Sequence, residues 1–381
     1  MKILIVLNYY YPYISGLSEC ARSLAEELAK DHDVTVLTAK HEENLSNTEH
    51  INGVKVVRAD ILFKISKGYI SPAYLKLFAK LQKEADIVNL HLPMIESGIL
   101  SMLTEKHKLY ITYQCDIHLT KSTLNQLITK VMDKSSSVAL NRANKVIISS
   151  SDYAENSRFL PKFAEKLIEI QPTSPTYEKL LNHHDNINKS KEKLRIGFCG
   201  RIVEEKGIDV LLRAAPKLKE VFPNLEIEIV GDYKSVAGGS VYTELKANIG
   251  WDESYVHFTG RLSDSEILNF YRSIDIFVLP SINSLEAFGM VQIEAMLAGV
   301  PVVATNLPGV REIVGNTKMG EIVEPKDVND LTNKIITVLQ NKNQYVKPTS
   351  YINSLYGVES AKNKYIQMFK DNNQFYSQEI N

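Results

Sequence analysis

Short apolar runs alternate with amphipathic stretches along the chain, and this alternation predicts the fold. In the first half, apolar runs with the length of buried strands occur at residues 3–7, 34–37, 54–57, 87–92, 110–113 and 146–149. In the second half they occur at residues 194–199, 227–230, 256–259, 276–279, 302–305 and 320–323. Helical spacing of apolar positions follows the first run, at Ala21, Leu24, Ala25 and Leu28. We therefore expect an α/β protein whose mostly parallel sheets are covered by helices and bind ligands at the carboxyl ends of their strands.

A polar segment without strand or helix periodicity divides the chain. Residues 176–193 are rich in Asn, Lys, His and Glu, which is typical of a linker. It separates a predicted first domain, residues 1–175, from a second, residues 194–354. In residues 355–381 apolar positions recur with helical spacing, so we expect a terminal helix there.

Two acidic residues flank the start of a predicted buried helix in the second domain. Glu286 follows the strand at 276–279, and Glu294 lies among apolar residues inside the helix. The helix would begin with the backbone N–H groups of Phe288, Gly289, Met290 and Val291. Such N–H groups and the helix dipole favour an anion such as phosphate, and each carboxylate can accept sugar hydroxyls. The alternative is that Glu286 is a turn residue and Glu294 a solvated helix residue. The apolar neighbours of Glu294 favour its burial.

A second charged motif follows the strand at 194–199. Arg201 and Lys206 are five positions apart, with Gly200 and Gly207 allowing a close backbone approach and a helix start. Two cations at the carboxyl end of a strand can converge on an anion, and phosphate is the obvious candidate. The alternative is a loop with solvated cations.

Together with further motifs in the same order, these residues resemble the retaining family-4 glycosyltransferases of GT-B fold. The motifs are Gly200-Arg201, Glu205-Lys206-Gly207, Val230-Gly231-Asp232, Phe258-Thr259-Gly260-Arg261, Phe277-Val278-Leu279-Pro280-Ser281, Glu286 with Glu294, Ala298-Gly299-Val300-Pro301-Val302-Val303-Ala304, and Pro308-Gly309. The resemblance implies two Rossmann-like doubly wound domains that face a central cleft. The first would bind the acceptor and the second the nucleotide-sugar, with residues 355–381 crossing back to the first domain.

The resemblance also implies roles for individual residues. Arg201 and Lys206 look like the pair that neutralises the donor diphosphate, Glu294 like the acid that binds the ribose, and Glu286 like the acid that engages the transferred sugar. Further donor contacts would come from Gly16, Arg261, Leu262, Phe288, Gly289, Met290 and Val291. We expect Glu286, Arg201 and Lys206 to be catalytic, because two cations and a helix dipole can stabilise the leaving diphosphate without a metal ion.

The chain departs from the family pattern at two positions. Leu17 stands where the family usually has a second glycine after Gly16, and Gln114 stands where many relatives have a histidine. Glutamine cannot take up a proton, so Gln114 is no general base. We expect Gln114, Asp116 and His118 to contact the acceptor, or else to be polar surface.

Residues 61–83 suggest contact with a membrane. Lysines at 64, 67, 76, 80 and 83 alternate there with aromatic and leucine side chains, and no acid lies inside the segment. An amphipathic basic helix can lie on an anionic membrane, where each lysine adds about 1 kcal/mol. The acceptor would then be lipid-linked. The alternative is a core helix with a solvated basic face.

Composition narrows the class of protein. The 381 residues are 44% hydrophobic, which can supply two domain cores, and a net charge of −1 gives no case for nucleic-acid binding. Three cysteines are too few for a disulfide framework, and no metal or cofactor is expected. The first apolar run is short for a secretory signal, and no run approaches the roughly 20 apolar residues that span a bilayer. We expect a cytoplasmic protein, at the inner face of the membrane if residues 61–83 bind it.

The predicted function is transfer of a hexose-type sugar from a nucleoside-diphosphate sugar to an acceptor hydroxyl, with retained anomeric configuration. Such a metal-independent enzyme would act in the assembly of cell-surface polysaccharide or glycolipid, on a saccharide or lipid-linked acceptor. Two alternatives remain open. One is a nucleotide-sugar epimerase or a phosphorylase of the same fold. The other is a non-catalytic glycosyltransferase-like partner subunit, which Leu17 and Gln114 suggest.

Overall fold

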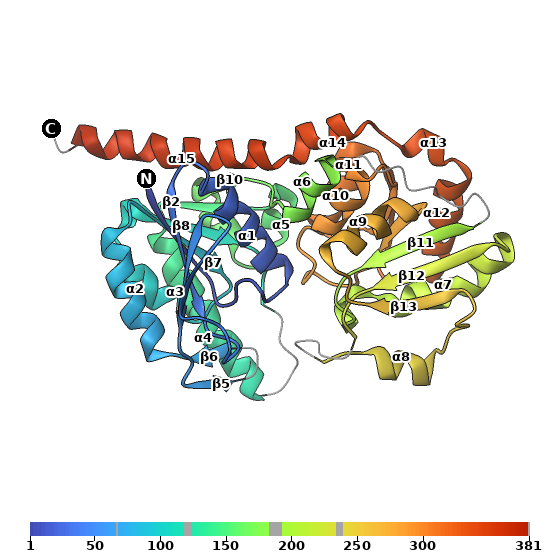
Figure 1. Ribbon diagram of the computed structural model, residues 1–381, viewed down its shortest axis with the longest axis horizontal. Coiled ribbons are helices and arrows are strands. Elements are labelled where there is room, and N and C mark those ends of the chain that lie inside the picture. Colours follow the sequence, from blue (N-terminus) through green and yellow to red (C-terminus); the bar gives the residue numbers. More distant parts are fainter. Residues whose placement is uncertain (66–67, 118–122, 183–192, 234–238, 380–381) are drawn as a thin grey trace. The chain divides into compact units, whose positions relative to one another are not determined.

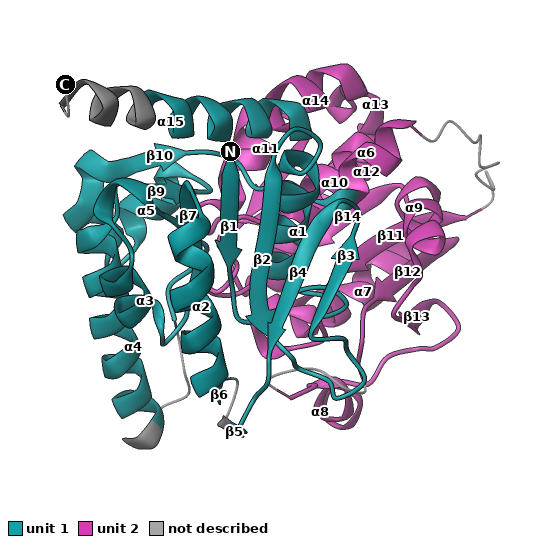
Figure 2. Cartoon of the chain, turned by 60° about the vertical axis from the view of Figure 1, so that its left-hand side comes forward, with its two compact units in different colours: residues 1–175, 358–381 teal, residues 176–357 magenta. Residues whose placement is uncertain are grey.

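The chain folds into two compact units (Figure 2). The computed structural model describes residues 1–65, 68–117, 123–182, 193–233 and 239–379. Unit 1 consists of residues 1–175 and 358–381, and unit 2 of residues 176–357. Each unit has its own mainly parallel sheet with helices packed around it (Figure 1). The predicted α/β class with two Rossmann-like sheets is confirmed.

The sheet of unit 1 has the strand order β10-β9-β8-β7-β1-β2-β4-β3, and only β3 is antiparallel to its neighbour. Its strands are β1 (Lys2–Val6), β2 (Asp33–Ala39), β3 (Thr48–Ile51), β4 (Val54–Ala59), β7 (Ile87–Leu92), β8 (Leu109–Tyr113), β9 (Lys145–Ile148) and β10 (Leu167–Glu169). The six predicted strands all occur, with ends within two residues of the prediction. The two that the pattern missed are β3, which is polar, and β10, which has three residues.

The helices of unit 1 are α1 (Gly16–Leu28), α2 (Pro72–Glu84), α3 (Ser97–Leu103), α4 (Thr123–Arg142), α5 (Ser151–Asn156) and α15 (Val358–Glu379). The core includes Ile3 and Ile5 of β1 with side chains of α1 and α15. Lys362 Nζ of α15 lies 3.3 Å from Glu27 Oε1 and 2.7 Å from Asp31 Oδ2, so this terminal helix is held to α1 by charge as well as by apolar packing.

Residues 61–83 do not form a single helix, which corrects the expectation. The strands β5 (Phe63–Ile65) and β6 (Gly68–Ile70) pair antiparallel, and α2 begins only at Pro72. The apolar face of α2 is buried, because Tyr74 and Phe78 pack into the unit and the Tyr74 hydroxyl donates to Leu7 O (3.0 Å). The basic face of α2 is exposed, so the alternative of a core helix describes this element.

The sheet of unit 2 is entirely parallel, in the order β13-β12-β11-β14-β15-β16. Its strands are β11 (Leu194–Cys199), β12 (Leu225–Val230), β13 (Val256–Gly260), β14 (Ile276–Leu279), β15 (Val302–Thr305) and β16 (Gly320–Val323). Its helices are α6 (Pro175–Asn182), α7 (Ile208–Val221), α8 (Tyr242–Asn248), α9 (Asp264–Ser273), α10 (Met290–Leu297), α11 (Val310–Thr317), α12 (Val328–Gln340), α13 (Lys342–Tyr345) and α14 (Thr349–Tyr356). The predicted strands again occur within two residues.

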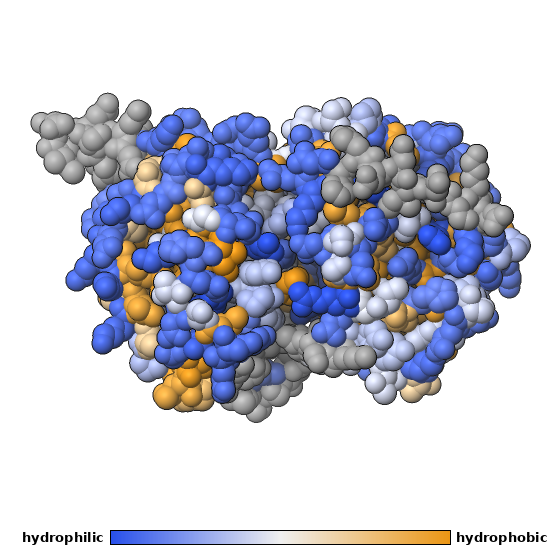
Figure 3. All heavy atoms as spheres, viewed as in Figure 1, coloured by the Kyte–Doolittle hydropathy of each residue, from blue (hydrophilic) through white to orange (hydrophobic). Residues whose placement is uncertain are grey.

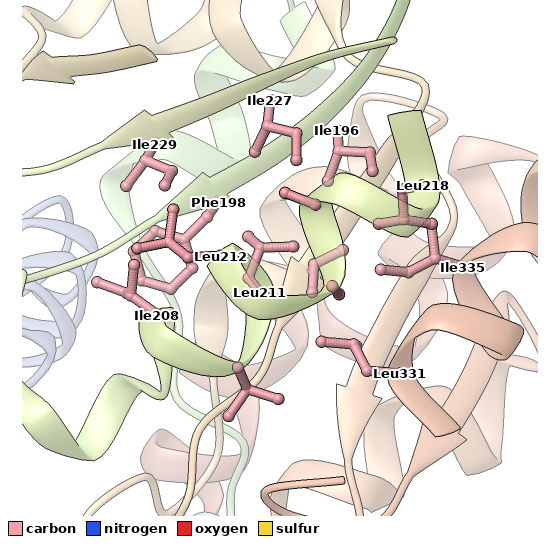
Figure 4. Close-up of a cluster of buried hydrophobic side chains, with 14 of the residues drawn as sticks. Ile196, Phe198, Ile208, Leu211, Leu212, Leu218, Ile227, Ile229, Leu331 and Ile335 are labelled. Carbon is pink, nitrogen blue, oxygen red and sulfur yellow. The ribbon is translucent and has the colours of Figure 1, made fainter. Parts of the chain in front are cut away.

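One core of unit 2 lies between the sheet and the helices α7 and α12 (Figure 4). Ile196 and Phe198 of β11 meet Leu211 and Leu218 of α7 and Ile335 of α12. From β11 the chain continues to β12 and β13 on one side, whereas β14, β15 and β16 lie on the other. The direction of strand addition therefore reverses between β11 and β14, and in open α/β sheets ligands bind at such a reversal.

The predicted linker begins with a helix. In α6, Tyr177 and Leu180 are buried, and the Tyr177 hydroxyl donates to Met290 O (3.4 Å). Lys179 forms an ion pair with Asp264 of α9. Residues 176–182 are thus part of unit 2, while residues 183–192 lie outside the described part.

Candidate functional site

The loops that follow β11 and β14 are in direct contact at the strand-order reversal. The N–H of Ile282 donates to Glu205 O (2.9 Å). Gly207 has φ +63°, and a Cβ placed on it would lie 2.0 Å from Pro280 O. Only glycine fits this position without a rearrangement of the backbone. The close approach brings Lys206, one residue before, next to the loop that carries Glu286.

Lys206 and Glu286 form an ion pair across this contact. Lys206 Nζ meets Glu286 Oε2, and the Ser281 hydroxyl donates to the same oxygen (3.2 Å). Only 16% and 11% of the two side chains are exposed. Partial burial strengthens the attraction, since less water screens it. The structure thus brings together two residues that the sequence analysis derived from separate motifs.

Arg201 is the second cation at this end of the sheet. It follows Gly200, and its Nη2 lies 3.3 Å from Glu205 Oε1. The neighbouring loop is packed closely here, because a Cβ on Gly231 would lie 1.8 Å from Gly200 O. Both predicted cations are therefore next to a carboxylate, and an anionic ligand would compete with these carboxylates for them.

Glu294 is buried inside α10, as its apolar neighbours indicated. Its exposed fraction is 8%, and Oε2 accepts a hydrogen bond from the hydroxyl of Tyr271 in α9 (2.5 Å). Burial raises the pKa of the Tyr271 hydroxyl well above its usual value, and the negative charge of Glu294 adds to the shift. Burial also raises the pKa of the Cys199 thiol, at the end of β11, to about 12, again with a contribution from Glu294. Tyr271 and Cys199 are therefore both neutral neighbours of this carboxylate near pH 7.

The amino end of α10 begins without a side-chain cap. Gly289 precedes the helix with φ +83°, and a Cβ there would lie 2.7 Å from Leu279 Cδ2. Gln292 Nε2 donates to Phe288 O (3.2 Å) and to Val310 O (3.1 Å), which fixes the turn. The first N–H groups of such a helix are available to an anion.

Of the remaining predicted donor residues, Met290 and Val291 are half-buried in the first turn of α10. The other three, Arg261, Leu262 and Gly16, lie near the ends of other strands. Arg261 is exposed and Leu262 is half-buried, directly after β13, which is two strands away from β11. Gly16 belongs to unit 1, where it is the first residue of α1 and is exposed.

The loop around Gly16 is fixed by a capping box. Ser15 Oγ accepts from the N–H of Ser18 (3.2 Å), and Ser18 Oγ accepts from the N–H of Ser15 (2.8 Å). Leu17, which stands in place of the second glycine of the family, packs against the core of unit 1. Its side chain therefore has a structural role.

Gln114 directly follows β8 and meets a histidine that the sequence analysis missed. Its Nε2 lies 3.4 Å from Nδ1 of His91, in the neighbouring strand β7. Burial lowers the pKa of His91 to about 3, so this imidazole is neutral at physiological pH. The signal available in the sequence was a polar residue near the end of the apolar run 87–92.

Asp116 is buried and holds its loop in place. Its carboxylate accepts from the Tyr113 hydroxyl (2.6 Å), from Ser157 Oγ (2.8 Å) and from the N–H of Arg158 (3.0 Å). His118 lies outside the described residues. Of the three expected acceptor contacts, Gln114 is therefore the half-buried one and Asp116 is bound within the loop.

Aromatic side chains gather at the carboxyl end of β1, where the sequence analysis singled out only Gly16. The rings of Tyr9 and Tyr13 stack at 4.8 Å, His41 meets Tyr13 edge-on at 5.7 Å, and Tyr69 meets Tyr9 edge-on at 6.1 Å. Glu96, after β7, is nearby, and burial raises its pKa to about 7. The run of tyrosines directly after the first predicted strand was the available signal.

In the ranges that the structure describes, no three His, Cys, Asp or Glu side chains are grouped as metal ligands. No helix in the described part of the chain has the length and apolar composition needed to span a membrane.

Sequence models of two families match the chain. The one described as Glycosyltransferase Family 4 matches residues 14–172, and the one described as Glycosyl transferases group 1 matches residues 181–354. An uncharacterised glycosyltransferase of Methanocaldococcus jannaschii is 26% identical over 360 residues, covering 90% of this chain and 89% of that protein. The phosphatidyl-myo-inositol mannosyltransferase of Mycobacterium leprae is 33% identical over 150 residues, which is 38% of this chain and 37% of that protein.

Solved structures share the fold. Sucrose-phosphate synthase from Thermosynechococcus elongatus superposes with a TM-score of 0.75 at 18% identity, covering 99% of both chains. Anabaena HepE, in complex with UDP and glucose, superposes with a TM-score of 0.72 at 19% identity, covering 97% of this chain and 100% of that one. At such identities the likeness shows a common fold.

Proposed function

The chain belongs to the family-4 glycosyltransferases of GT-B fold, and on this premise we propose that it transfers a sugar from a nucleoside-diphosphate sugar to an acceptor hydroxyl. The observation that supports the proposal best is the Lys206–Glu286 pair at the strand-order reversal of unit 2. It supports the proposal because a cation that can bind phosphate lies beside an acid that can accept sugar hydroxyls, at the edge where α/β sheets bind nucleotides.

For the donor, the diphosphate binds to Arg201, Lys206 and the first N–H groups of α10, from Phe288 to Val291. Phosphate then replaces the carboxylates as partner of the two cations, and Glu286 becomes an acceptor for hydroxyls of the transferred sugar. Glu294, held by Tyr271, receives the ribose, since a carboxylate can accept several hydrogen bonds. The nucleobase lies by Arg261 and Leu262, after β13 of the same unit.

For the reaction, we propose retention of the anomeric configuration. The bond between the anomeric carbon and the phosphate oxygen breaks, a bond to the acceptor oxygen forms, and the acceptor proton moves to the leaving phosphate. Negative charge grows on the diphosphate as the bond breaks, and Arg201, Lys206 and the positive end of α10 stabilise it. These groups supply the charge stabilisation that a divalent ion gives in other enzymes.

For the acceptor, the proposal places Gln114 and His118 in contact with it, with Asp116 ordering the loop between them. A lipid-linked or saccharide acceptor is supported by the matching mannosyltransferase, which is named for a phosphatidylinositol substrate. The setting is the assembly of cell-surface polysaccharide or glycolipid in the cytoplasm. The inner face of the membrane would be met by the exposed lysines of α2 and by the β5–β6 pair within residues 61–83.

A panel of nucleoside-diphosphate sugars tests the proposal, beginning with UDP-glucose, since a solved neighbour was crystallised with it. A donor at about 100 times its dissociation constant should stabilise the chain by about 2.7 kcal/mol in thermal unfolding. With that donor, Glu286→Ala should lower transfer or donor hydrolysis by about 10²- to 10³-fold.

The matched control is Glu204→Ala, an exposed acid in the neighbouring loop, which should leave the rate unchanged. Epimerised donor in the absence of any acceptor would favour the epimerase alternative. Binding without turnover in any acceptor mixture would favour a non-catalytic subunit. Equal rates for Glu286→Ala and wild type would contradict the site.

A further inference from the structure

Large apolar side chains are exposed on one side of unit 1. Leu127 of α4 and Met102 of α3 have exposed fractions of 60% and 58%. Among the described residues of unit 2, the largest value for a bulky hydrophobic residue is 40%, at Tyr351. Exposed apolar groups are ordinary when scattered, but neighbouring ones on adjacent helices mark an interaction surface.

The helices α3 and α4 lie side by side in the same direction. The Ser135 hydroxyl of α4 donates to Ile95 O (2.6 Å) and accepts from the N–H of Gly98 (2.8 Å). At the end of α4, Arg142 Nε donates to Ser101 O of α3 (2.8 Å). The start of α3 is therefore beside Ser135 and its end beside Arg142.

Because α3 begins beside Ser135, it does not cover the first turns of α4. Leu127, Val131 and Ser135 are spaced by four residues, so they share one side of α4. Ser135 contacts α3, whereas Val131 and Leu127 precede the start of α3 by about one and two turns. Both side chains are exposed, as is that of Ile95, whose backbone carbonyl contacts Ser135.

Along α3 the exposed apolar positions continue with helical spacing. We define the α3–α4 face by its six exposed apolar residues: Ile95, Ile99, Met102, Leu103, Leu127 and Val131. The β5–β6 pair, with exposed Leu62, Phe63 and Ile70, lies at the same end of unit 1 as the beginning of α4 (Figures 1 and 2). Figure 3 shows hydrophobic side chains gathered on this side of unit 1.

Lysines border the face on both sides. Lys130 and Lys134 are exposed on α4, and α2, which packs beside α3, exposes Lys76, Lys80 and Lys83. The helix α3 carries no charged residue, and α2 and α4 each contain more basic than acidic residues. This local excess contrasts with the net charge of −1 for the whole chain.

We propose that the α3–α4 face docks on a membrane that contains anionic lipids. Apolar side chains at the centre enter the boundary between headgroups and acyl chains, while the bordering lysines remain at the level of the anionic headgroups. A second copy of the chain fits less well, since a twofold contact would place one basic border against another. The occupant is therefore a lipid surface.

The inference deepens the proposed function, on which it rests for a lipid-linked acceptor. Binding to vesicles is itself independent of sugar transfer. The two proposals can therefore fail separately. If the chain binds vesicles but transfers no sugar, the inference is supported and the proposed function is contradicted. If it transfers sugar without binding vesicles, the proposed function is supported and the inference is contradicted.

Co-sedimentation of the full chain with vesicles of phosphatidylcholine and phosphatidylglycerol tests the inference, with pure phosphatidylcholine for comparison. The double variant Met102→Gln, Leu127→Gln should weaken binding to mixed vesicles at least about tenfold, because two apolar side chains no longer enter the bilayer. The double variant Lys130→Ala, Lys134→Ala should weaken it about 30-fold on mixed vesicles and leave binding to pure phosphatidylcholine unchanged.

Leu355→Gln is the matched control, because it changes an exposed leucine of unit 2, and it should bind like wild type. All replaced side chains are exposed, so thermal unfolding should remain unchanged and shows that each variant is folded. Equal vesicle binding by wild type and both double variants would overturn the inference. The inference would also be overturned if light scattering without vesicles showed a dimer of the wild type and a monomer of the double variant Met102→Gln, Leu127→Gln.

Discussion

Charged side chains follow the central strand β11 of unit 2, whereas aromatic ones follow the central strand β1 of unit 1. In unit 2, Lys206 is paired with Glu286 and Arg201 with Glu205. In unit 1, the corresponding end presents the stacked rings of Tyr9 and Tyr13. Both sheets are mainly parallel and reverse their strand order, so the same framework positions two different chemistries.

The two sets of side chains suit ligands of different chemistry. Paired charges that can be exchanged for phosphate suit a ligand with a diphosphate. Aromatic rings and a neutral imidazole suit a ligand with apolar and hydroxyl groups, because they contribute apolar area and hydrogen bonds without charge. We therefore expect charge-removing substitutions in unit 2 to affect the reaction of the donor. In unit 1 we expect pH to affect stability.

The largest effect is expected from Lys206→Met, which keeps the length of the side chain and removes its charge. Without this cation the leaving diphosphate loses one of its stabilising groups, and the rate of sugar transfer should fall about 10²- to 10³-fold, or about 3 to 4 kcal/mol. The measurement is kcat/KM with the donor that the thermal-shift panel identifies.

Lys217→Met is the control for this experiment. Lys217 is an exposed lysine of α7 that pairs with Glu220, so its loss should leave kcat/KM unchanged. If Lys206→Met instead lowered only the unfolding temperature and kept its rate, the Lys206–Glu286 pair would be structural. The contrast between the two strand ends would then have no functional meaning.

The next effect concerns the stability of unit 1 at different pH. Burial raises the pKa of Glu96 to about 7, above its ordinary value near 4.5. Between these two values the unfolded chain has lost the proton that the folded chain retains, so rising pH favours unfolding. The shift corresponds to about 3 kcal/mol, which is lost as pH rises from about 4.5 to 7 and stays lost above 7.

Glu96→Gln should remove this loss, because the amide is neutral at every pH. We expect the variant to exceed wild type by about 3 kcal/mol in the free energy of unfolding at pH 8, and to match it at pH 4. Urea unfolding across this pH range measures the difference, and the exposed Glu43→Gln serves as control. Parallel pH profiles for Glu96→Gln and wild type would show that the strand ends of unit 1 do not disfavour charge.

The sequence predicted the twelve central strands because parallel strands are buried on both faces and therefore read as continuous apolar runs. It missed β3, β5, β6 and β10, which are short or polar and lie at an edge or outside the main sheets. The apolar and basic pattern of residues 61–83 also suggested a single helix, where the structure has β5, β6 and α2. There, exposed apolar residues of a strand pair were mistaken for part of the apolar face of α2.

The residues of the candidate site were named from the sequence, but the pairs that they form in the structure could not be predicted from it. Lys206 and Glu286 are 80 positions apart, and their contact depends on β11 and β14 being neighbours. The apolar positions around Glu294 predicted its burial but not its partner, since Tyr271 belongs to another helix. His91 and Glu96 were missed because their unusual pKa values arise from tertiary burial, which local sequence does not reveal.

The smallest effect is expected from Tyr271→Phe, which removes the hydroxyl that donates to Glu294. A hydrogen bond to a charged group contributes about 2 kcal/mol, so nucleotide binding should weaken by up to that amount if Glu294 must be held in place for the ribose. Tyr345→Phe is a matched control, because the Tyr345 hydroxyl donates to Glu321 Oε1 (2.6 Å) in the same unit but away from the proposed donor site. It should lower stability and leave nucleotide affinity unchanged. Calorimetric titration with the donor nucleotide separates the two variants. Equal nucleotide affinities of wild type and Tyr271→Phe would place the ribose away from Glu294.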